Sequence, residues 1–174
     1  MRISLALHSL RGYPPSNRKG LNSLRKHLVT LLGSVFYTGF FPFAPATFLC
    51  MVWLAAYLFI PGGGFLSSPI SVAVMLPLAL YLSHEMEKIY GKDASQIVID
   101  EFVGMQVTML AIEPSILKGV MGFMLFRIFD IAKPFPVGKS QKIRGGLGVV
   151  LDDVLAGIYA YGVLFILVNV FHLN

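Results

Sequence analysis

Acidic side chains are concentrated in three short motifs that lie far apart in the sequence. Asp100 and Glu101 form the first motif, Asp130 forms the second, and Asp152 and Asp153 form the third. Carboxylate oxygens are hard ligands that suit Mg²⁺, which usually binds one or two carboxylates together with substrate phosphates. If the three motifs meet in the fold, these five carboxylates predict a magnesium site.

Basic residues and glycines accompany the acids. Arg127 lies three residues before Asp130, which places the two side chains on one face of a helix, and Lys133 follows three residues later. The glycine-rich stretch 145–148 precedes the third acidic motif, and backbone N–H groups at such a helix start can hold an anion. These neighbours predict a phosphate-binding site beside the metal. The alternative is that the acids form only structural salt bridges with Arg127, Lys133 and Arg144.

Two glycines lie one helical turn after an acid. Gly104 follows Asp100 by four residues, and Gly157 follows Asp153 by four, so each pair shares a helix face. A glycine there lets the backbone of another helix come close to the carboxylate, as small residues do in membrane proteins. We therefore expect the helices that carry these acids to pack closely.

The chain is unusually apolar for a soluble protein. Apolar residues make up 56% of its 174 residues and charged residues only 13%, against about 25% charged residues in a typical soluble domain. No Lys, Arg, Asp or Glu occurs in residues 27–84 or 154–174, and an apolar stretch of about 18 residues is long enough to span a bilayer. The sequence therefore predicts an integral membrane protein. The alternative is a soluble helical bundle with an exceptionally apolar core.

Six apolar segments, separated by clusters of proline and glycine, predict an all-α, polytopic membrane bundle. Several are shorter than the ~20 residues of a full span, so we expect short or re-entrant helices, and we expect the first segment not to span. Broken backbone at membrane depth must be buried or line a polar cavity. This makes the prolines at 42 and 45 either a candidate cavity wall or a simple tight turn. The six segments are 28–41, 47–60, 70–83, 97–112, 116–132 and 149–171.

The distribution of basic residues predicts the topology. Residues 1–27 contain six bases and no acid. Such an arm can bind nucleic acid, but beside a hydrophobic segment it is better suited to anionic lipid headgroups. We expect this basic N-terminal arm to lie in the cytoplasm and to precede a membrane domain of residues 28–174. Bases in the loops 84–94 and 133–148 then give five crossings and place the acidic motifs, and hence the active site, at cytoplasmic helix ends.

Three stretches of the sequence resemble the phosphatidylglycerophosphatase A family. They are IVIDEFVGM at 97–105, FRIFDIAKPFP at 126–136 and GGLGVVLDDVLAG at 145–157, and the similarity extends from about Leu28 to the last apolar segment. The order and spacing of the three motifs are specific. The resemblance implies an all-α, Mg²⁺-dependent phosphatase of the bacterial cytoplasmic (inner) membrane. Such an enzyme hydrolyses the phospholipid phosphatidylglycerophosphate to phosphatidylglycerol and phosphate, without a cysteine nucleophile.

The resemblance also implies roles for individual residues, through the positions that match the family's motifs. Acids of the three motifs are implied as catalytic and metal-binding groups, and two bases and a threonine as ligands of the substrate phosphate. By number, the catalytic residues are Asp100, Glu101, Asp130 and Asp153, the Mg²⁺ ligands are these four and Asp152, and the phosphate ligands are Arg127, Lys133 and Thr47.

One stretch departs from the family's pattern. The family usually has Pro-Gly-Thr-x-Gly-Ser where this sequence has Pro-Ala-Thr-Phe-Leu-Cys at 45–50, so Thr47 is retained while both glycines and the serine are replaced. We expect Ala46 and Leu49 to narrow this loop and to bear on the choice of substrate. Asp93, by contrast, matches a position that is commonly acidic in the family.

Two other functions share part of this pattern. A phosphotransferase that moves an alcohol headgroup onto a nucleotide-activated lipid also needs acids and a metal at the membrane surface, but it should have a nucleotide-binding motif. A divalent-cation transporter should carry its acids near the middle of the bilayer rather than at helix ends. The sequence leaves open whether water or an aspartate attacks phosphorus. It predicts the lipid bilayer as a partner, and neither a protein partner nor nucleic acid.

Overall fold

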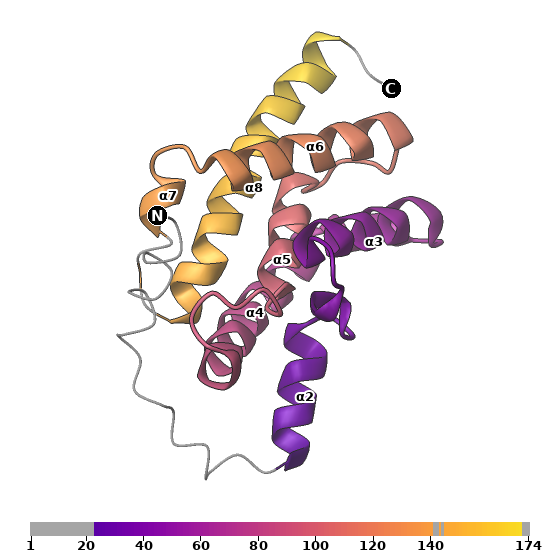
Figure 1. Cartoon of the computed structure of the whole chain (residues 1–174). Coiled ribbons are helices and arrows are strands. Elements are labelled where there is room, and N and C mark those ends of the chain that lie inside the picture. The colour runs from indigo at the N-terminus through magenta and orange to yellow at the C-terminus, as the bar shows by residue number, and fades with distance from the viewer. Residues whose placement is uncertain (1–22, 141–142, 144, 172–174) are drawn as a thin grey trace.

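The computed structural model describes residues 23–140, 143 and 145–171, and the regular elements within these ranges are all helices. Residues 1–22 of the predicted basic arm lie outside the described residues, as do Lys142 and Arg144. Figure 1 shows how the helices are arranged. They are α2 (Ser23–Gly33), η2 (Thr38–Phe40), α3 (Pro45–Phe59), η3 (Gly63–Ser67), α4 (Pro69–Tyr90), α5 (Ile99–Thr108), α6 (Ile116–Ala132), α7 (Val137–Ser140) and α8 (Gly146–Val170), where η denotes a 3₁₀-helix.

The short helix α5 lies at the centre of the bundle (Figure 1). It packs against α3, α4, α6 and α8, and α8 in turn contacts α4, α6 and α7. The first acidic motif is on α5, the second is on α6 and the third is on α8. The packing of these three helices therefore brings the acidic motifs into one part of the molecule.

Two glycines allow α5 and α8 to touch through their backbones. A Cβ atom on Gly157 would lie 2.7 Å from the carbonyl oxygen of Gly104. A Cβ atom on Gly104 would lie 2.5 Å from the ring of Phe126 and 3.2 Å from the carbonyl oxygen of Asp153. Because no larger residue fits without movement of these neighbours, the close packing expected from the glycine spacing is confirmed.

Prolines and left-handed residues set several helix ends. Pro45 and Pro69 begin α3 and α4, where the missing backbone N–H has no helical partner to lose. The hydroxyl of Ser68 caps α4 by accepting a hydrogen bond from the backbone N–H of Ser71 at 3.1 Å. At the other side of the bundle, α6 ends where Lys133 takes a left-handed conformation with φ 44°. This end fixes where the Lys133 side chain leaves the helix.

Some helix boundaries match the predicted segments and others do not. The bounds of α6 coincide with the predicted segment 116–132. The end of α4 lies at Tyr90 rather than Ser83, because the polar stretch that follows Ser83 is helical and buries Glu87. The end of α5 lies at Thr108 rather than residue 112, ahead of Ala111, which is left-handed with φ 55°.

The predicted first segment is divided in two. Three left-handed residues, 35–37, with φ between 44° and 65°, follow α2. The hydroxyl of Ser34 holds this turn, because it donates to the carbonyl oxygen of Thr30 at 2.6 Å and accepts from the backbone N–H of Tyr37 at 3.1 Å. The 11 residues of α2 rise only about 16 Å, against about 30 Å of bilayer hydrocarbon. This helix is therefore too short to cross a membrane by itself.

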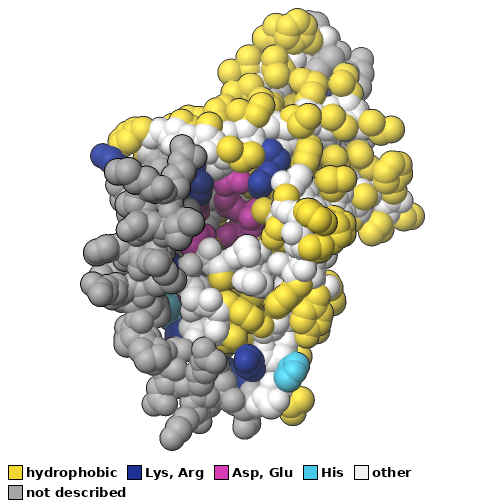
Figure 2. Space-filling view, viewed as in Figure 1, with side chains coloured by type: hydrophobic (Ala, Val, Ile, Leu, Met, Phe, Trp, Pro, Cys, Tyr) yellow, Lys and Arg dark blue, Asp and Glu magenta, His cyan; other side chains and the backbone are white. Residues whose placement is uncertain are grey.

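Two helices are long and apolar enough to cross a membrane. They are α4, with 22 residues, and α8, with 25, whereas the apolar helix α3 has 15 residues and α5 has 10. Large hydrophobic side chains are exposed on α3, α6 and α8, and Figure 2 shows them over much of the upper part of one face. The part of the chain that the structure describes thus contains two candidate membrane spans, and the five predicted crossings stay a prediction.

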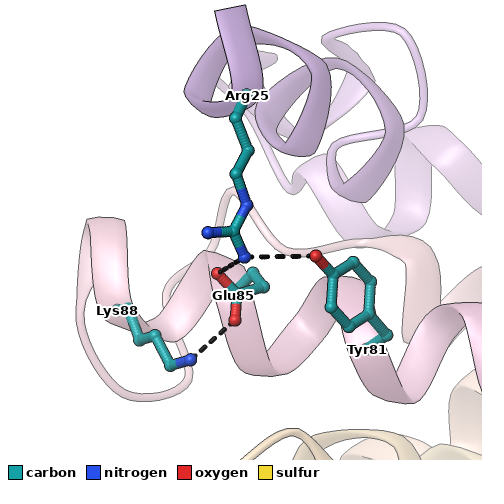
Figure 3. Close-up of polar contacts among 4 residues, drawn as sticks. All are labelled: Arg25, Tyr81, Glu85 and Lys88. Carbon is teal, nitrogen blue, oxygen red and sulfur yellow. Dashed lines mark hydrogen bonds and ion pairs between the residues drawn. The ribbon is translucent and has the colours of Figure 1, made fainter. Parts of the chain in front are cut away.

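An ion-pair network attaches α2 to α4 (Figure 3). A guanidinium nitrogen of Arg25 donates to Glu85 at 3.0 Å and to the hydroxyl of Tyr81 at 3.2 Å, and the ammonium of Lys88 donates to the second oxygen of Glu85 at 2.6 Å. Glu85 is buried, and its two oxygens each have a basic partner. The network therefore compensates the charge of this carboxylate at the contact between α2 and α4.

Replacement of Gly157 by alanine is expected to destabilise the bundle by about 1–3 kcal/mol, because the added methyl group would press on the backbone of α5. Gly162→Ala is the matched control, since it lies on the same helix with nothing within 4 Å of its Cβ position. It should be neutral or stabilising by up to about 1 kcal/mol, because alanine favours a helix more than glycine does. Thermal unfolding of the detergent-purified variants measures both effects. Equal unfolding midpoints for the two variants would contradict the tight α5–α8 contact.

Candidate active site

Three carboxylates from two helices converge in the structure. Asp100 and Glu101 are in the first turn of α5, and Asp153 is the eighth residue of α8. One ligand oxygen from each side chain lies within 4.8 Å of the others. Asp100 and Asp153 are buried, and Glu101 is partly buried. Two motifs that are about 50 residues apart in sequence thus meet, and they do so next to the glycines that let their helices approach.

Each of these three carboxylates has an oxygen without a partner among the described residues. The unpaired atoms are Oδ1 of Asp100, Oε2 of Glu101 and Oδ2 of Asp153, and all three are shielded from solvent. A buried carboxylate without a compensating partner is costly, and several such groups side by side also repel one another. Hard, negatively charged oxygens in this arrangement fit a divalent cation such as Mg²⁺.

The other two predicted acids are paired with bases. Nη1 of Arg127 donates to Oδ2 of Asp130 at 2.8 Å, and Nζ of Lys133 donates to Oδ2 of Asp152 at 2.6 Å. The alternative of structural salt bridges thus describes one oxygen of each of these two acids, and Oδ1 of Asp152, like an oxygen of each of the first three acids, is buried without a partner among the described residues. Electrostatic interactions still connect Asp130 with Glu101 and with Asp153, so the second motif belongs to the same group of charges.

Both bases retain capacity to bind an anion. Nε of Arg127 is buried and has no hydrogen-bond partner among the described residues. Burial lowers the pKa of the Lys133 ammonium, but the hydrogen bond and the charge of Asp152 outweigh it and raise this pKa above its ordinary value. Lys133 is therefore a cation at neutral pH, and an ammonium has three donors of which Asp152 takes one.

A cavity of about 340 Å³ opens onto these groups. The two bases and three of the five acids of the motifs lie on its wall, together with the loop before α5 and the start of α3. Figure 2 shows acidic side chains inside a hollow, with basic side chains beside them. The lining residues are Pro45, Ala46, Asp93, Ala94, Ser95, Ile97, Asp100, Glu101, Arg127, Asp130, Ile131 and Lys133.

The start of α3 forms one side of the cavity. Pro45 and Ala46 are among the lining residues, so the expectation that this proline-rich turn forms a cavity wall is confirmed for Pro45. Thr47 is partly buried in the first turn of α3 and is not one of the lining residues. Its role as a phosphate ligand stays a prediction.

The loop before α5 was only partly anticipated from the sequence. Asp93, which matched a commonly acidic position, lies on the cavity wall with Ala94 and Ser95. The backbone N–H of Asp93 donates to Glu87 at 3.3 Å, and Glu87 is buried on α4. The sequence did not indicate Glu87, because the charged residues that follow Ser83 are typical of a loop rather than of a buried helix face.

The glycine-rich stretch 145–148 lies in a different environment from the one predicted. A Cβ on Gly146 would lie 2.4 Å from the carbonyl oxygen of Leu80, and a Cβ on Gly145 would lie 3.2 Å from the ring of His84. These glycines therefore let the start of α8 pack directly on α4. None of them lines the cavity, and α8 begins six residues before Asp152. The phosphate cradle predicted for these glycines therefore stays a prediction.

Comparison with known proteins relates the chain to phospholipid phosphatases. The family model described as phosphatidylglycerophosphatase A matches residues 31–168. A protein of Bacteroides thetaiotaomicron with the provisional name phosphatidylinositol-3-phosphatase is 37% identical over 77% of this chain and 89% of its own length.

Two relatives named phosphatidylglycerophosphatase A match a shorter part. The Escherichia coli protein is 38% identical over 55% of this chain and 58% of its own length, and the Haemophilus influenzae protein is 40% identical over 55% and 61%. No solved structure matches the chain significantly. Because the family model covers most of the sequence, including all three acidic motifs, the chain belongs to the phosphatidylglycerophosphatase A family.

Proposed function

We propose that this protein is a Mg²⁺-dependent lipid phosphatase that hydrolyses phosphatidylglycerophosphate to phosphatidylglycerol and phosphate. The observation that carries the proposal is the group formed by Asp100, Glu101 and Asp153: each has an unpaired buried oxygen, and two of the three line a cavity with two bases on its wall. Two relatives with this activity in their names support the choice of substrate. The hydrolysis of a phosphomonoester is also the reaction that acids, a divalent ion and bases together suit.

In this proposal, Asp100, Glu101 and Asp153 hold the Mg²⁺ ion, and Asp152 and Asp130 complete the negative charge around it. When bound there, Mg²⁺ supplies a Lewis acid for the phosphate oxygens and lowers the pKa of water. Asp100 and Glu101 line the cavity, so they would hold the ion inside a space that is large enough for a headgroup. Without a bound cation, the negative charges of these carboxylates would repel an anionic phosphate.

The bases bind and orient the phosphate. The unpaired Nε of Arg127 and the free donors of Lys133 hydrogen-bond the phosphate oxygens and stabilise the charge that develops on them in the transition state. The hydrogen bond from Arg127 to Asp130 fixes the guanidinium, so that it is already oriented when substrate binds. Asp130 lines the same cavity and is the residue we assign to accept a proton from attacking water.

We place the enzyme in the bacterial cytoplasmic membrane with its active site facing the cytoplasm. The candidate spans α4 and α8 support a membrane location. The basic residues in the predicted loops 84–94 and 133–148 support the orientation, because positive residues favour the cytoplasmic side. In this orientation, we expect the site to lie at the level of the lipid headgroups, where the phosphate of the substrate is.

A lipid phosphorylated on inositol is a second candidate substrate. The Bacteroides relative, whose name refers to such a lipid, matches more of this chain than the two phosphatidylglycerophosphatases do. Both substrates present a phosphomonoester on the headgroup and differ in the polyol that carries it. The altered turn at Pro45 and Ala46 lies on the cavity wall, where it can contact that polyol.

Replacement of Asp153 or Asp100 by asparagine is expected to lower phosphate release by at least about 100-fold, because each change removes a charged oxygen from the proposed ion site. Glu85→Gln is the control: it is also a buried carboxylate, but it pairs with Arg25 and Lys88 outside the cavity. This variant should keep activity within about threefold, even if its stability falls. The measurement is Mg²⁺-dependent phosphate release by folded, detergent-purified protein. Full activity of Asp153→Asn would exclude the proposed ion site.

The purified protein is expected to release phosphate fastest from phosphatidylglycerophosphate, more slowly from phosphatidylinositol 3-phosphate and phosphatidic acid, and not at all in EDTA. Addition of Mg²⁺ in excess of EDTA should restore the rate, because the carboxylates need a divalent partner. Faster release from the inositol lipid would move the assignment to the second substrate. Absence of phosphate release from all three lipids with Mg²⁺ present would overturn the phosphatase and leave a headgroup phosphotransferase or a cation transporter to be tested.

A further inference from the structure

Part of the edge of the cavity is apolar, although acidic and basic side chains line its interior and the exposed Asp93 and Ser95 lie on the side of the loop before α5. Ile131 lines the cavity, yet its side chain is 71% exposed. Phe43, two residues before the wall residue Pro45, is 78% exposed, and Phe135, two residues after the wall residue Lys133, is also exposed. Figure 2 shows hydrophobic side chains along the edge of the hollow that contains the acids. Exposed apolar residues thus lie on the cavity wall or within two residues of it in two separate segments, and we call these residues the rim.

Both sides of this rim are held in place by neighbouring groups. On the side of Phe43, the ring of Phe41 stacks on that of Phe48 in α3, with centroids 4.1 Å apart and planes at 11°. On the other side, the hydroxyl of Tyr159 in α8 donates to the backbone carbonyl of Phe135 at 3.0 Å. The exposed apolar side chains are therefore carried by anchored segments.

A basic side chain lies next to Phe135 at the rim. Nζ of Lys139 lies 4.8 Å from the centre of the Phe135 ring. An aromatic ring together with a lysine is typical of the boundary between the hydrocarbon and the headgroups of a bilayer. This pair favours a position of the rim at that boundary, where a lipid can enter sideways from the membrane.

We infer that Ile131 and Phe43 form the entry on which the acyl chains of the substrate lie while its phosphate occupies the cavity. The inference rests on the proposed lipid phosphatase function and adds to it where the apolar part of the substrate binds. An acyl chain is the occupant that matches both parts of the surface, because one molecule joins an apolar tail to the anionic phosphate that Arg127 and Lys133 suit. Contact between the rim and the chains keeps both out of water during the reaction.

The two helices that flank the rim offer matched controls at their far ends. Ile116 begins α6, which Ile131 nearly ends, and Ile116 is 66% exposed. Phe59 ends α3, which follows Phe43 closely, and Phe59 is 74% exposed. Neither control residue lines the cavity. Ile131→Gln and Phe43→Gln are therefore compared with Ile116→Gln and Phe59→Gln, which make the same chemical change at similar exposure.

Two forms of phosphatidylglycerophosphate separate binding of the chains from binding of the headgroup. One is the dioleoyl lipid in detergent micelles, and the other is the dibutanoyl form, which is soluble in water as a monomer. Ile131→Gln and Phe43→Gln should each lower kcat/KM for the dioleoyl lipid by about tenfold through a higher KM, and change it less than about twofold for the dibutanoyl form. The two control variants should stay within about twofold on both substrates.

A second measurement does not depend on how the variants fold. Wild-type protein is irradiated with phosphatidylglycerophosphate that carries a diazirine on one acyl chain close to its ester carbonyl, and the labelled peptides are identified by mass spectrometry. Labelling that unmodified substrate displaces should fall on residues 40–48 and 124–139, and not on residues 55–65.

Several results would overturn the inference. Equal losses on both substrates would show that the rim variants disturb the headgroup site or an interface with another protein. Losses as large in the control variants, or displaceable labelling at residues 55–65 alone, would place the chains elsewhere. If wild-type protein hydrolyses neither form, the proposed function itself fails, which is distinct from hydrolysis that is insensitive to the rim.

Discussion

The burial of several carboxylates between packed helices is the constraint on which the rest of this structure depends. Like charges out of water raise the free energy of the fold unless something compensates them. Arg127 pairs with one oxygen of Asp130, and Lys133 pairs with one oxygen of Asp152. Buried oxygens without a partner in the described part of the chain remain on four of the five acids, Asp100, Glu101, Asp152 and Asp153. A stable fold that retains such a group therefore favours a bound cation, which is also the chemistry that the proposed reaction needs.

The architecture of the bundle follows from the need to bring these acids together. A carboxylate on α5 can approach one on α8 only if the two backbones come close, and Gly104 and Gly157 provide this at positions one turn from the acids. The two bases come from the end of α6, where the left-handed Lys133 stops the helix beside the cavity. The glycines that allow the helices to pack thus lie one turn from the acids of the site. A substitution that disturbs the helix packing is therefore expected to disturb the site as well.

Much of the fold and of the site could be predicted from the sequence, because charge is scarce in it. In a chain with long uncharged stretches, the few acids and bases predict the site, and the predicted segment 116–132 coincides with α6. The extension of α4 beyond Ser83 was not predicted, because Glu85, Glu87 and Lys88 suggested a loop, whereas burial and ion pairs keep them in a helix. Residue spacing also does not encode which acid meets which base, since this depends on how α6 and α8 cross.

The position of the acids along α8 affects the free energy that is needed to bring the phosphate of a lipid to the site. Asp152 and Asp153 lie near the start of this helix, and the 17 residues from 154 to 170 that follow them carry no charge and rise about 26 Å. With that stretch in the hydrocarbon, the reactive phosphate is reached without extraction of the fatty acids from the leaflet, which would cost about 0.8 kcal/mol for each exposed methylene. In the proposed function, the lipid substrate and product can thus diffuse laterally in the leaflet, and only inorganic phosphate is released to water.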